Sequence, residues 1–484
     1  MISEPAVGKA FFGRTGVMRV LEKRVNALKG GYRQNVALTG QMLSGKSSIL
    51  SQLLYSLNER SLIPIYVEVV EEPFASFAGK FVATMLFNFL SLLGVEAQKD
   101  LPSLIKASEK YVPHTVHAIG RMHSELSRKN YNDAYRKLLS LTSVLKKETG
   151  RSCIVILDEF HNMEHLKIKK PYLQFGKIIM IQKDTMYIVS SSQKSTFKKI
   201  LSEKLALLYG NFEIIEVSGF DNKTANAFLR EKLGPVELPE DQANYLIDFT
   251  DGNPFYLDVI SKKMRETAAS FTRAAVDEGV LVESFTSLIY NTSGTINQYF
   301  TNIIMNLIEK TVRKDYLDLL VALACGRNKL KDIASWFHKK STSDISKKLI
   351  HLRELDMVRR NGSFYEIQDN VFKFWIRTVY HKRKNALVDD ILNRADDFKA
   401  AVKTDTYRYL AESHKSITER VKELLLSFDG ETVEIERKNR KLPRFTRIEV
   451  KKYGKQFDLL PLSDRDRYWV LEISSDRIDE TAVS

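Results

Sequence analysis

The chain has 484 residues, of which 44% are apolar and 28% are charged. This balance is typical of folded globular proteins and excludes a chain that is mostly disordered. There are 74 Lys and Arg residues against 60 Asp and Glu residues, so the formal net charge is +14. An excess of this size favours polyanionic partners such as nucleic acid, nucleotides or an anionic surface. At about 150 residues per domain, the length predicts about three domains.

Targeting signals and disulfides are not expected. Met1–Lys9 lacks the apolar core of a secretory signal, and the longest apolar window, Thr84–Leu93, is interrupted by polar residues and too short to span a bilayer. The two cysteines, Cys153 and Cys325, lie in apolar runs and cannot form a disulfide framework. We therefore expect a cytoplasmic protein with buried, reduced thiols and no membrane contact.

Short apolar runs alternate with helical segments in the first part of the chain. The run Cys153–Leu157 is continuously apolar, as expected for a strand buried on both faces of a parallel sheet. Strands separated by helices predict a parallel, doubly covered α/β sheet, with the domain at residues 8–219. The expected strands are residues 35–39, 63–70, 153–157, 186–189 and 212–217.

A glycine-bounded loop follows the first expected strand. Residues 40–47 read Gly-Gln-Met-Leu-Ser-Gly-Lys-Ser, which fits the phosphate-loop pattern G-x-x-x-x-G-K-[ST]. Its backbone N–H groups and the following helix N-terminus favour anions, with Lys46 reaching the β- and γ-phosphates and Ser47 binding Mg²⁺. A solvated turn is the alternative, but the loop lies between a strand and a helix. The expected nucleotide-binding residues are Gly40, Gln41, Ser44, Gly45, Lys46, Ser47 and Ser48.

Two acids close the apolar strand at residues 153–157. Asp158 and Glu159 are expected at the sheet edge where ligands bind in α/β folds. Asp158 is a candidate to hold Mg²⁺ through water, and Glu159 to deprotonate the attacking water. The alternative, two solvated acids at the start of a loop, is weakened by the phosphate loop. The pair therefore predicts ATP hydrolysis, with Lys46 and Glu159 as catalytic residues.

Polar residues also follow the strand expected at 186–189. Ser191 and Ser192 are candidate catalytic residues that contact the γ-phosphate or the lytic water, although Ser is also a common helix N-cap. His161 and His165 flank Glu159 without a spacing typical of zinc ligands, so no zinc is expected.

The second half of the chain is predicted to contain helices and then a compact helix–hairpin unit. Residues 222–291 show apolar spacing typical of helices. Helices are expected at 316–325, 330–337 and 343–355, followed by two strands about Asn361-Gly362, a strong hairpin signal. Three helices and a hairpin predict a winged helix. Helices and then strands are expected over residues 384–484.

Several of these motifs together resemble the archaeal branch of the STAND-type AAA+ ATPases. The resemblance rests on Phe12-Gly13-Arg14, the loop at 40–47, Asp158-Glu159-Phe160, Ser190–Ser192, Leu208-Tyr209-Gly210, Gly252–Tyr256 and Asp369–Trp375. It implies an α/β P-loop NTPase with an AAA+/ASCE parallel sheet, a helical lid at 220–300, a winged-helix domain at 301–383 and a small α/β nuclease-like domain at 384–484. It also implies that Arg14 and Pro254 bracket the nucleotide.

The chain departs from this family at two positions. Asn211 stands where relatives usually carry an arginine that senses or completes a neighbouring site, and His161 stands where relatives often carry glutamine. An arginine finger can be worth about 10³–10⁵ in rate, so we expect slow, switch-like hydrolysis.

Basic residues on the expected winged helix favour a DNA partner. Lys347, Lys348, His351 and Arg353 lie on its last helix, Arg359 and Arg360 on the hairpin, and Lys329, Lys331, Lys339 and Lys340 upstream. The alternative is a winged helix that locks the nucleotide-bound state without touching DNA, as STAND-type proteins often do. Partners other than ATP and ADP are therefore DNA, a protein, or a second copy of the chain.

The last domain resembles a PD-(D/E)xK nuclease, weakly. Its strands offer Asp458 and Glu472 as metal ligands, but Ser474 stands where the catalytic lysine is required, which predicts an inactive domain. A basic cluster could bind nucleic acid there; it comprises Arg437, Lys438, Arg440, Lys441, Arg444, Arg447, Lys451, Lys452 and Lys455, with Phe445 and Tyr453. The expected function is an ATP-hydrolysing switch, and the alternative is an ATP-gated DNA nuclease.

Overall fold

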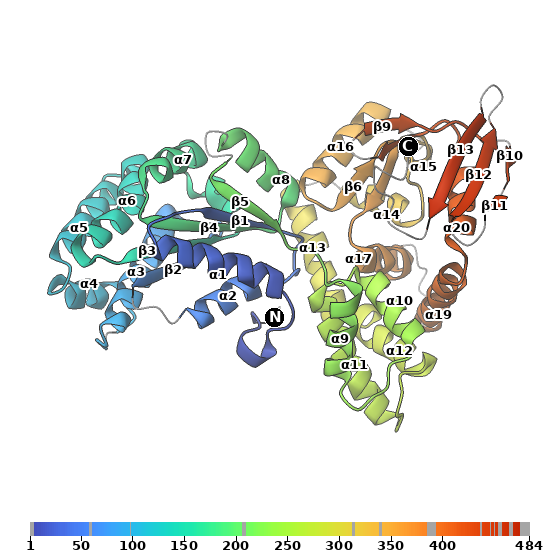
Figure 1. Ribbon diagram of the computed structural model, residues 1–484, viewed down its shortest axis with the longest axis horizontal. Coiled ribbons are helices and arrows are strands. Elements are labelled where there is room, and N and C mark those ends of the chain that lie inside the picture. Colours follow the sequence, from blue (N-terminus) through green and yellow to red (C-terminus); the bar gives the residue numbers. More distant parts are fainter. Residues whose placement is uncertain are drawn as a thin grey trace. The chain divides into compact units, whose positions relative to one another are not determined.

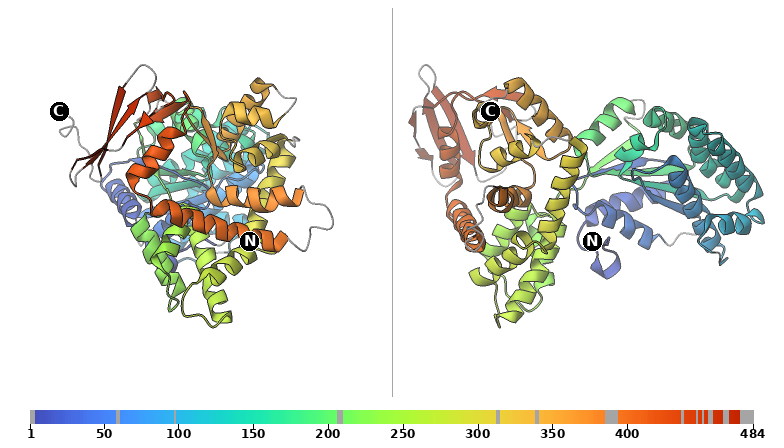
Figure 2. Two further views of the ribbon diagram at one scale, coloured as in Figure 1. Left: turned by 90° about the vertical axis from the view of Figure 1, so that its right-hand side faces the viewer. Right: turned by 180° about the vertical axis from the view of Figure 1, so that it is seen from behind.

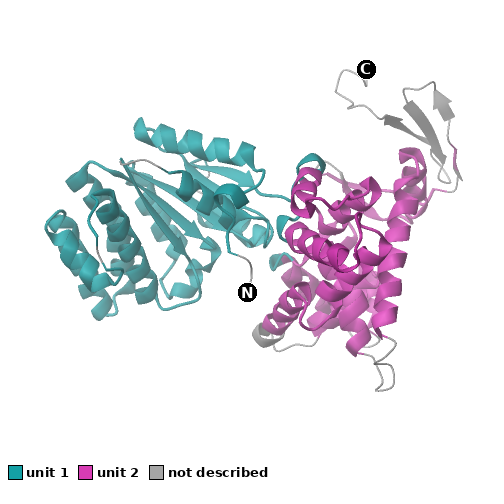
Figure 3. Ribbon diagram, turned by 90° about the horizontal axis from the view of Figure 1, so that it is seen from below, with its two compact units in different colours: residues 1–224, 253–255, 354–356 teal, residues 225–252, 256–353, 357–484 magenta. Residues whose placement is uncertain are grey.

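The chain forms two compact units in the computed structural model (Figure 3). Unit 1 comprises Met1–Thr224, Asn253–Phe255 and Glu354–Asp356, and unit 2 comprises Ala225–Gly252, Tyr256–Arg353 and Met357–Ser484. The structure describes residues 4–57, 61–96, 98–205, 210–311, 315–337, 341–384, 394–435, 438–445, 447–449, 451–453, 457–463 and 468–474.

Unit 1 is built on a five-stranded parallel sheet, as the alternation of apolar runs and helices predicts. The strand order is β2-β3-β4-β1-β5, so β4 lies between β1 and β3. The predicted α/β P-loop fold class is therefore confirmed, and each strand falls within a few residues of its expected range. The strands are β1 (Asn35–Thr39), β2 (Leu62–Glu68), β3 (Ser152–Asp158), β4 (Thr185–Ser191) and β5 (Phe212–Glu216).

Helices cover both faces of this sheet (Figure 1). Successive residues of β3 alternate between two apolar clusters: Val155 and Leu157 belong to one, and Ile154 and Ile156 to the other. A continuous apolar run is needed because both faces are buried. The helices of unit 1 are α1 (Thr15–Lys29), α2 (Lys46–Ser56), α3 (Phe74–Leu92), α4 (Leu101–Glu109), α5 (Pro113–Ser127), α6 (Tyr131–Thr149), α7 (Pro171–Ile181) and α8 (Lys194–Lys199).

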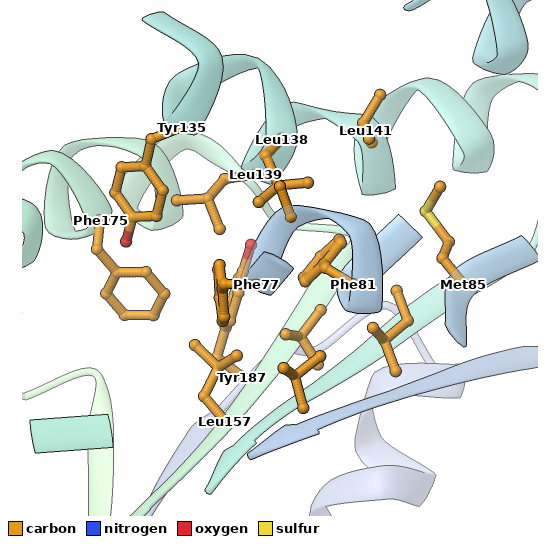
Figure 4. Packing of buried hydrophobic residues seen from close by; sticks show 14 of the residues in the cluster. Phe77, Phe81, Met85, Tyr135, Leu138, Leu139, Leu141, Leu157, Phe175 and Tyr187 are labelled. Carbon is orange, nitrogen blue, oxygen red and sulfur yellow. The ribbon is translucent and has the colours of Figure 1, made fainter. Parts of the chain in front are cut away.

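The larger cluster lies between the sheet and α3, α6 and α7. Phe77 and Phe81 of α3 point toward Leu157 and Tyr187 of the strands, with Leu139 of α6 beyond them (Figure 4). The helix α3 is long and apolar enough, by length and composition, to cross a membrane. Its apolar side chains instead form much of this core, which accounts for their number.

Unit 2 begins with helices and continues with a hairpin (Figure 2). The elements α14, α15 and α16 are followed by the antiparallel pair β6–β7, the order expected for a winged helix. The helices up to this hairpin are α9 (Asn222–Leu233), which starts in unit 1, α10 (Glu240–Thr250), α11 (Pro254–Ser270), α12 (Glu278–Phe285), α13 (Thr295–Thr311), α14 (Asp315–Ala324), α15 (Leu330–Trp336) and α16 (Thr342–Glu354); the strands are β6 (Val358–Asn361) and β7 (Phe364–Ile367).

Within its described residues, the remainder of unit 2 contains four further α-helices and six strands. They are α17 (Asn370–Trp375), α18 (His381–Lys384), α19 (Arg394–Ser413) and α20 (Ile417–Leu426), then β8 (Thr432–Ile435), β9 (Lys438–Lys441), β10 (Arg447–Ile448), β11 (Lys451–Tyr453), β12 (Phe457–Ser463) and β13 (Tyr468–Ser474). The register of β12 and β13 places Asp458 opposite Ile473 and Leu459 opposite Glu472, so the two acids considered for a nuclease site are not cross-strand partners.

The two cysteines differ in burial. Cys153 is buried in β3, as predicted, and burial raises its pKa to about 12. Cys325 was expected to be buried as well, but it is exposed because α14 ends at Ala324, one residue earlier. The prediction for Cys325 was therefore wrong.

Candidate functional site

The glycine-bounded loop connects β1 to α2 at the carboxyl edge of the sheet. Gly45 has φ +92° and directly precedes the first residue of α2. A Cβ atom on Gly40 would lie 2.3 Å from the carbonyl oxygen of Val217, so only glycine fits there. These two glycines hold the loop close to the sheet, with the N-terminus of α2 at its end.

Lys46 is buried in the loop that precedes it. The residue is 4% exposed, and its ammonium donates to the carbonyl oxygens of Gly40 at 3.0 Å and Gln41 at 2.8 Å. Burial lowers the pKa of Lys46, while the nearby carboxylates of Glu159 and Asp158 act to raise it. The lysine therefore belongs to the same charged cluster as the acid pair.

Asp158 is held at the end of β3 by three hydroxyl groups. Asp158 is 2% exposed, and its carboxylate accepts hydrogen bonds from Ser47 at 2.9 Å, from Tyr66 at 2.9 Å and from Ser190. These residues come from α2, β2 and β4, and the structure thus brings the two candidate Mg²⁺ ligands, Ser47 and Asp158, into direct contact. Burial and the neighbouring Asp158 raise the pKa of Tyr66, so its hydroxyl stays a donor.

Glu159 occupies a left-handed backbone conformation with φ +52°, which is unusual for a residue other than glycine. One of its carboxylate oxygens accepts from the backbone N–H of Ser192 at 3.0 Å and from the Ser192 hydroxyl at 2.8 Å. Burial raises the pKa of Glu159, and the Lys46 ammonium and the Ser192 hydrogen bonds oppose this shift. A carboxylate with a raised pKa is a better proton acceptor near neutral pH.

His161 adds a group whose place in this cluster was not predicted. Its Nδ1 lies 2.9 Å from the hydroxyl oxygen of Ser191 and 3.3 Å from the carboxylate of Glu159. Ser191 is fully buried at the end of β4. The candidate catalytic residues Glu159, Ser191 and Ser192 therefore lie together, with His161 linking two of them.

The two other serines of the phosphate loop, Ser44 and Ser48, differ in what their hydroxyl groups contact. Ser44 is 2% exposed, and its hydroxyl has no hydrogen-bond partner among the described residues. An unpartnered buried hydroxyl in a phosphate loop fits a bound oxyanion. The Ser48 hydroxyl instead accepts the N–H of Ala6, so its side chain contacts the N-terminal segment.

Arg14 and Pro254 both contact this loop. The guanidinium of Arg14 donates to the carbonyl oxygens of Ser44 at 2.9 Å and Ser218 at 2.6 Å, and burial lowers its pKa to about 10. The Pro254 ring lies 3.7 Å from the position of a Cβ on Gly45. The segment Asn253–Phe255 belongs to unit 1, so these contacts are internal to that unit.

A second re-entrant segment of unit 1 contacts the helix that follows the Ser191-Ser192 pair. The carboxylate of Asp356 accepts from the N–H of Ser195 at 3.1 Å and from its hydroxyl at 2.6 Å. Glu354 pairs with Lys199 at 2.7 Å. The segment Glu354–Asp356 thus attaches to α8, three residues beyond Ser192.

The donor set fits a nucleoside triphosphate with Mg²⁺. The loop offers backbone N–H groups, a lysine and an unpartnered hydroxyl for phosphate oxygens, and Ser47 with Asp158 offers the oxygen ligands that Mg²⁺ prefers. Among the described residues there is no cluster of three or more His, Cys, Asp or Glu side chains that could hold a metal ion by themselves. A site that shares its metal with substrate phosphates does not need one.

Two groups that contact the site, Tyr66 and His161, were not predicted to do so, and the Leu-Tyr-Gly turn is only partly described. Tyr66 belongs to no motif, and its one signal in the sequence is its place near the end of an apolar strand. His161 was noted as a departure from the family, but its contacts with Ser191 and Glu159 were not predicted. Of the Leu-Tyr-Gly turn, Leu208 and Tyr209 lie outside the described residues, whereas Asn211 is exposed and its carbonyl accepts from Asn35.

The chain matches one family model and resembles several solved structures. A family model described as an ATPase domain predominantly from Archaea matches residues 11–260. The fold is similar to that of a Walker-type ATPase of Pyrococcus abyssi, at 18% identity and a TM-score of 0.53 over 78% of this chain and 99% of that chain. No curated protein matches this chain.

Two more distant structures give TM-scores below 0.5. The ORC2 protein of Aeropyrum pernix, solved with ADPNP and ADP, has 13% identity and a TM-score of 0.46 over 85% of this chain and 98% of that chain. The RuvB Holliday junction branch migration motor of Thermotoga maritima has 14% identity and a TM-score of 0.35 over 77% of this chain and 98% of that chain.

Proposed function

Because the chain belongs to the family of ATPase domains found predominantly in Archaea, we propose that it is an ATP-hydrolysing molecular switch that couples its nucleotide state to DNA. The family establishes ATP binding and hydrolysis. The residue roles, the magnesium ion, the switch behaviour and the DNA partner are the parts that we propose.

The hydrogen bond between Ser47 and Asp158 carries the proposed site. It joins the phosphate-loop helix to the acidic end of β3 at 2.9 Å, although the two residues are 111 positions apart. We assign phosphate binding to the loop at 40–48, with Arg14 and Pro254 beside it, and Mg²⁺ binding to Ser47 and Asp158. When bound there, Mg²⁺ would neutralise charge on the β- and γ-phosphate oxygens.

Glu159 is the proposed general base. Its carboxylate is oriented by Ser192 and carries a raised pKa, so it can accept a proton from the attacking water. As the water oxygen bonds to the γ-phosphorus, the bond from that phosphorus to the β–γ bridging oxygen breaks and ADP leaves. Lys46 is assigned to charge stabilisation on the transferring phosphoryl group, and Ser191 and Ser192 to sensing it. Since Asn211 replaces the arginine common in relatives, turnover is expected to be slow.

Coupling is proposed to run through α8. This helix starts two residues after Ser192. It holds Glu354, the last residue of α16, and Asp356, which lies between α16 and β6 in the chain. A shift of Ser192 with nucleotide state would therefore act on the segment that joins the last helix of the proposed winged helix to its hairpin. This supports a switch more than a simple hydrolase.

DNA is the partner that the charge of the chain favours. The net charge of +14 and the basic residues of α16 and the β6–β7 hairpin support contacts with phosphates, without indicating a base sequence. A protein partner, or a second copy of the chain, is the alternative if the helix–hairpin unit serves only to lock the nucleotide-bound state. We place the protein in the cytoplasm, as its composition favours.

The test is ATP turnover with and without duplex DNA, at two salt concentrations because phosphate contacts are salt-dependent. DNA should change the turnover rate at low salt and less so at high salt. Lys46→Ala should remove ATP binding. No effect of DNA on turnover or on binding at either salt concentration would contradict the DNA coupling while leaving the ATPase assignment intact.

A nuclease function has no observation in its favour. Asp458 and Glu472 are not cross-strand partners in the register of β12 and β13, and Ser474 occupies the position that a catalytic lysine would need. Cleavage of plasmid or linear DNA with Mg²⁺ or Mn²⁺, abolished by Asp458→Ala, would overturn this conclusion.

A further inference from the structure

The tip of the β6–β7 hairpin is covered by another strand of unit 2. The N–H of Ser363 donates to the carbonyl oxygen of Thr432 at 2.8 Å, and the N–H of Thr432 donates to the Ser363 hydroxyl at 3.1 Å. The N–H of Glu434 donates to the side-chain oxygen of Asn361 at 2.8 Å. Thr432 and Glu434 belong to β8, so this strand lies directly against the hairpin turn.

Side chains beside the turn hold this arrangement in place. Lys329 forms an ion pair with Glu431, the residue before β8, and its ammonium lies 5.5 Å from the centroid of the Phe364 ring. Phe364 also packs edge-on against Phe428, at 5.9 Å between ring centroids. The hairpin tip is therefore a docking position for the β8–β9 pair and is covered by backbone on one side.

Several cations of the helix–hairpin unit are engaged by neighbouring groups, whereas Lys331 and Lys347 are exposed and have no ion pair with another described residue. Lys348 pairs with Asp315 at 2.7 Å, and Arg359 pairs with Glu366 at 2.9 Å. Arg360 donates to the carbonyl oxygen of Gly362 at 2.6 Å and lies over the Tyr365 ring. Exposed pairs of this kind are weak, but each one must be broken or shared before its cation can bind a phosphate.

The cations of β9 are placed differently. Lys438, Arg440 and Lys441 are exposed, and none has an ion pair or side-chain hydrogen bond with another described residue. Glu434 is the exposed acid on the facing strand, opposite Asn439. Lys438 and Arg440 are two positions apart on one strand, so they share a face at a spacing of about 7 Å.

We propose that β9, whose partner strand β8 contacts the tip of the β6–β7 hairpin, is the surface that binds the phosphate backbone of duplex DNA. This inference rests on the proposed DNA coupling and names the surface responsible for it. The β8–β9 pair is a separate two-stranded sheet that covers the hairpin tip. It carries Lys438, Arg440 and Lys441, which have no ion pair with another described residue. Binding through them is electrostatic and independent of base sequence.

The test compares two full-length variants that each lose three positive charges. One is Lys438→Gln with Arg440→Gln and Lys441→Gln; the matched control is Lys347→Gln with Arg359→Gln and Arg360→Gln, on α16 and β6. The probe is a short fluorescent duplex of mixed sequence, titrated over a range of salt concentrations. Basal ATP turnover without DNA should be unchanged in both variants, since neither alters the phosphate-loop site.

The β9 variant should bind duplex DNA at least about tenfold more weakly at low salt. Each lost phosphate contact removes about 0.9 from the slope of log affinity against log salt. Loss of the two cations that share a face, Lys438 and Arg440, should therefore make the slope shallower by about 1.8. The control variant should change both quantities less. An unchanged β9 variant beside a control variant that no longer binds would overturn this inference and leave the DNA coupling standing.

Two further outcomes would overturn it as well. If the wild-type chain binds no duplex DNA even at low salt, the inference and the proposed DNA coupling both fail. If the wild-type chain prefers single-stranded RNA or anionic vesicles to duplex DNA, the surface has another partner. Coincident thermal unfolding of the wild type and both variants shows that the substitutions act on binding, as expected for exposed side chains.

Discussion

Ser192 donates two hydrogen bonds to the same carboxylate oxygen of Glu159, one from its backbone N–H at 3.0 Å and one from its hydroxyl at 2.8 Å. Ser192 directly follows β4 and Glu159 directly follows β3, and these strands are neighbours in the sheet. Ser192, the residue proposed to sense the nucleotide, therefore orients Glu159, the proposed base. A movement of Ser192 would directly change the position of the Glu159 carboxylate.

Removal of the Ser192 hydroxyl should lower kcat without a matching change in KM for ATP. Ser192→Ala keeps the backbone donor and loses one of two contacts that orient Glu159, so we expect kcat to fall by between about tenfold and a hundredfold. Ser192→Thr retains a hydroxyl and is the matched control. Steady-state ATP turnover measures both. A Ser192→Ala enzyme with wild-type kcat would contradict the orienting role.

The acid limb of the pH profile should report Glu159. The proposed base acts as a carboxylate, so turnover rises as pH increases through its pKa. Burial raises that pKa above the ordinary value for Glu, and the acid limb should lie correspondingly higher. Ser192→Ala removes a hydrogen bond that lowers the pKa and should move the limb further up. The measurement is kcat as a function of pH under saturating ATP.

Replacement of the base itself separates binding from hydrolysis. Glu159→Gln should lower turnover by about 10²–10⁴ while ATP remains bound, because the phosphate loop is untouched. Bound nucleotide, extracted from the purified variant, should then be ATP. Unchanged turnover in this variant would refute the assignment of Glu159 as base.

Asp158 should govern the magnesium requirement. Asp158→Asn keeps the shape of the side chain but removes its charge, and we expect half-maximal turnover to need about 10–100 times more Mg²⁺. Tyr66→Phe is the matched control, because it removes one donor to Asp158 and leaves the carboxylate in place. An Asp158→Asn enzyme with the wild-type magnesium dependence would show that the metal is held elsewhere.

The site was partly predictable because its motifs lie at the ends of apolar strands. The phosphate loop and the acid pair could be located from residues 40–47 and 158–159, since a strand buried on both faces has a continuous apolar sequence. The strand order could not be predicted, and it decides which strand ends meet. Tyr66 reaches Asp158 only because β2 pairs with β3.

The same limit applies outside the site. The hairpin about Asn361-Gly362 was predictable from its turn residues. Gly362 is required by the turn and also by the close approach of Thr432 in β8. Thr432 lies 70 residues further along the chain, so this second requirement depends on tertiary structure alone. Segments such as Glu354–Asp356, which return to unit 1, also carry no local sequence signal.

Asp356 offers a test of the proposed coupling. Asp356→Ala leaves the N–H and hydroxyl of Ser195 without their acceptor, so we expect a loss of about 1–3 kcal/mol in unfolding free energy. The effect of DNA on ATP turnover should shrink, while basal turnover is retained. Lys199→Ala, which removes an exposed pair with Glu354, is the control and should cost less than about 1 kcal/mol. Undiminished DNA stimulation in Asp356→Ala would exclude this segment from the coupling.

The docking of β8 on the hairpin tip can be tested with two glycines that share a backbone conformation. Gly362 has φ +55° and Gly430 has φ +83°, so alanine is strained at both positions by about 1–2 kcal/mol. A Cβ on Gly362 would also lie 1.9 Å from the carbonyl oxygen of Thr432, whereas the nearest atom to a Cβ on Gly430 is the flexible Lys441 side chain at 3.8 Å. Only Gly362→Ala should therefore separate β8 from the hairpin.

Hydrogen exchange measures that separation directly. The amides of Ser363 and Glu434, which donate across the contact, should exchange faster in Gly362→Ala than in Gly430→Ala. If docking is what presents β9 to DNA, duplex affinity should fall in Gly362→Ala although all of its cations remain. If these amides are equally protected from exchange in the two variants, the backbone strain that both share accounts for every change. The contact between residue 362 and Thr432 would then not be what holds β8 in place.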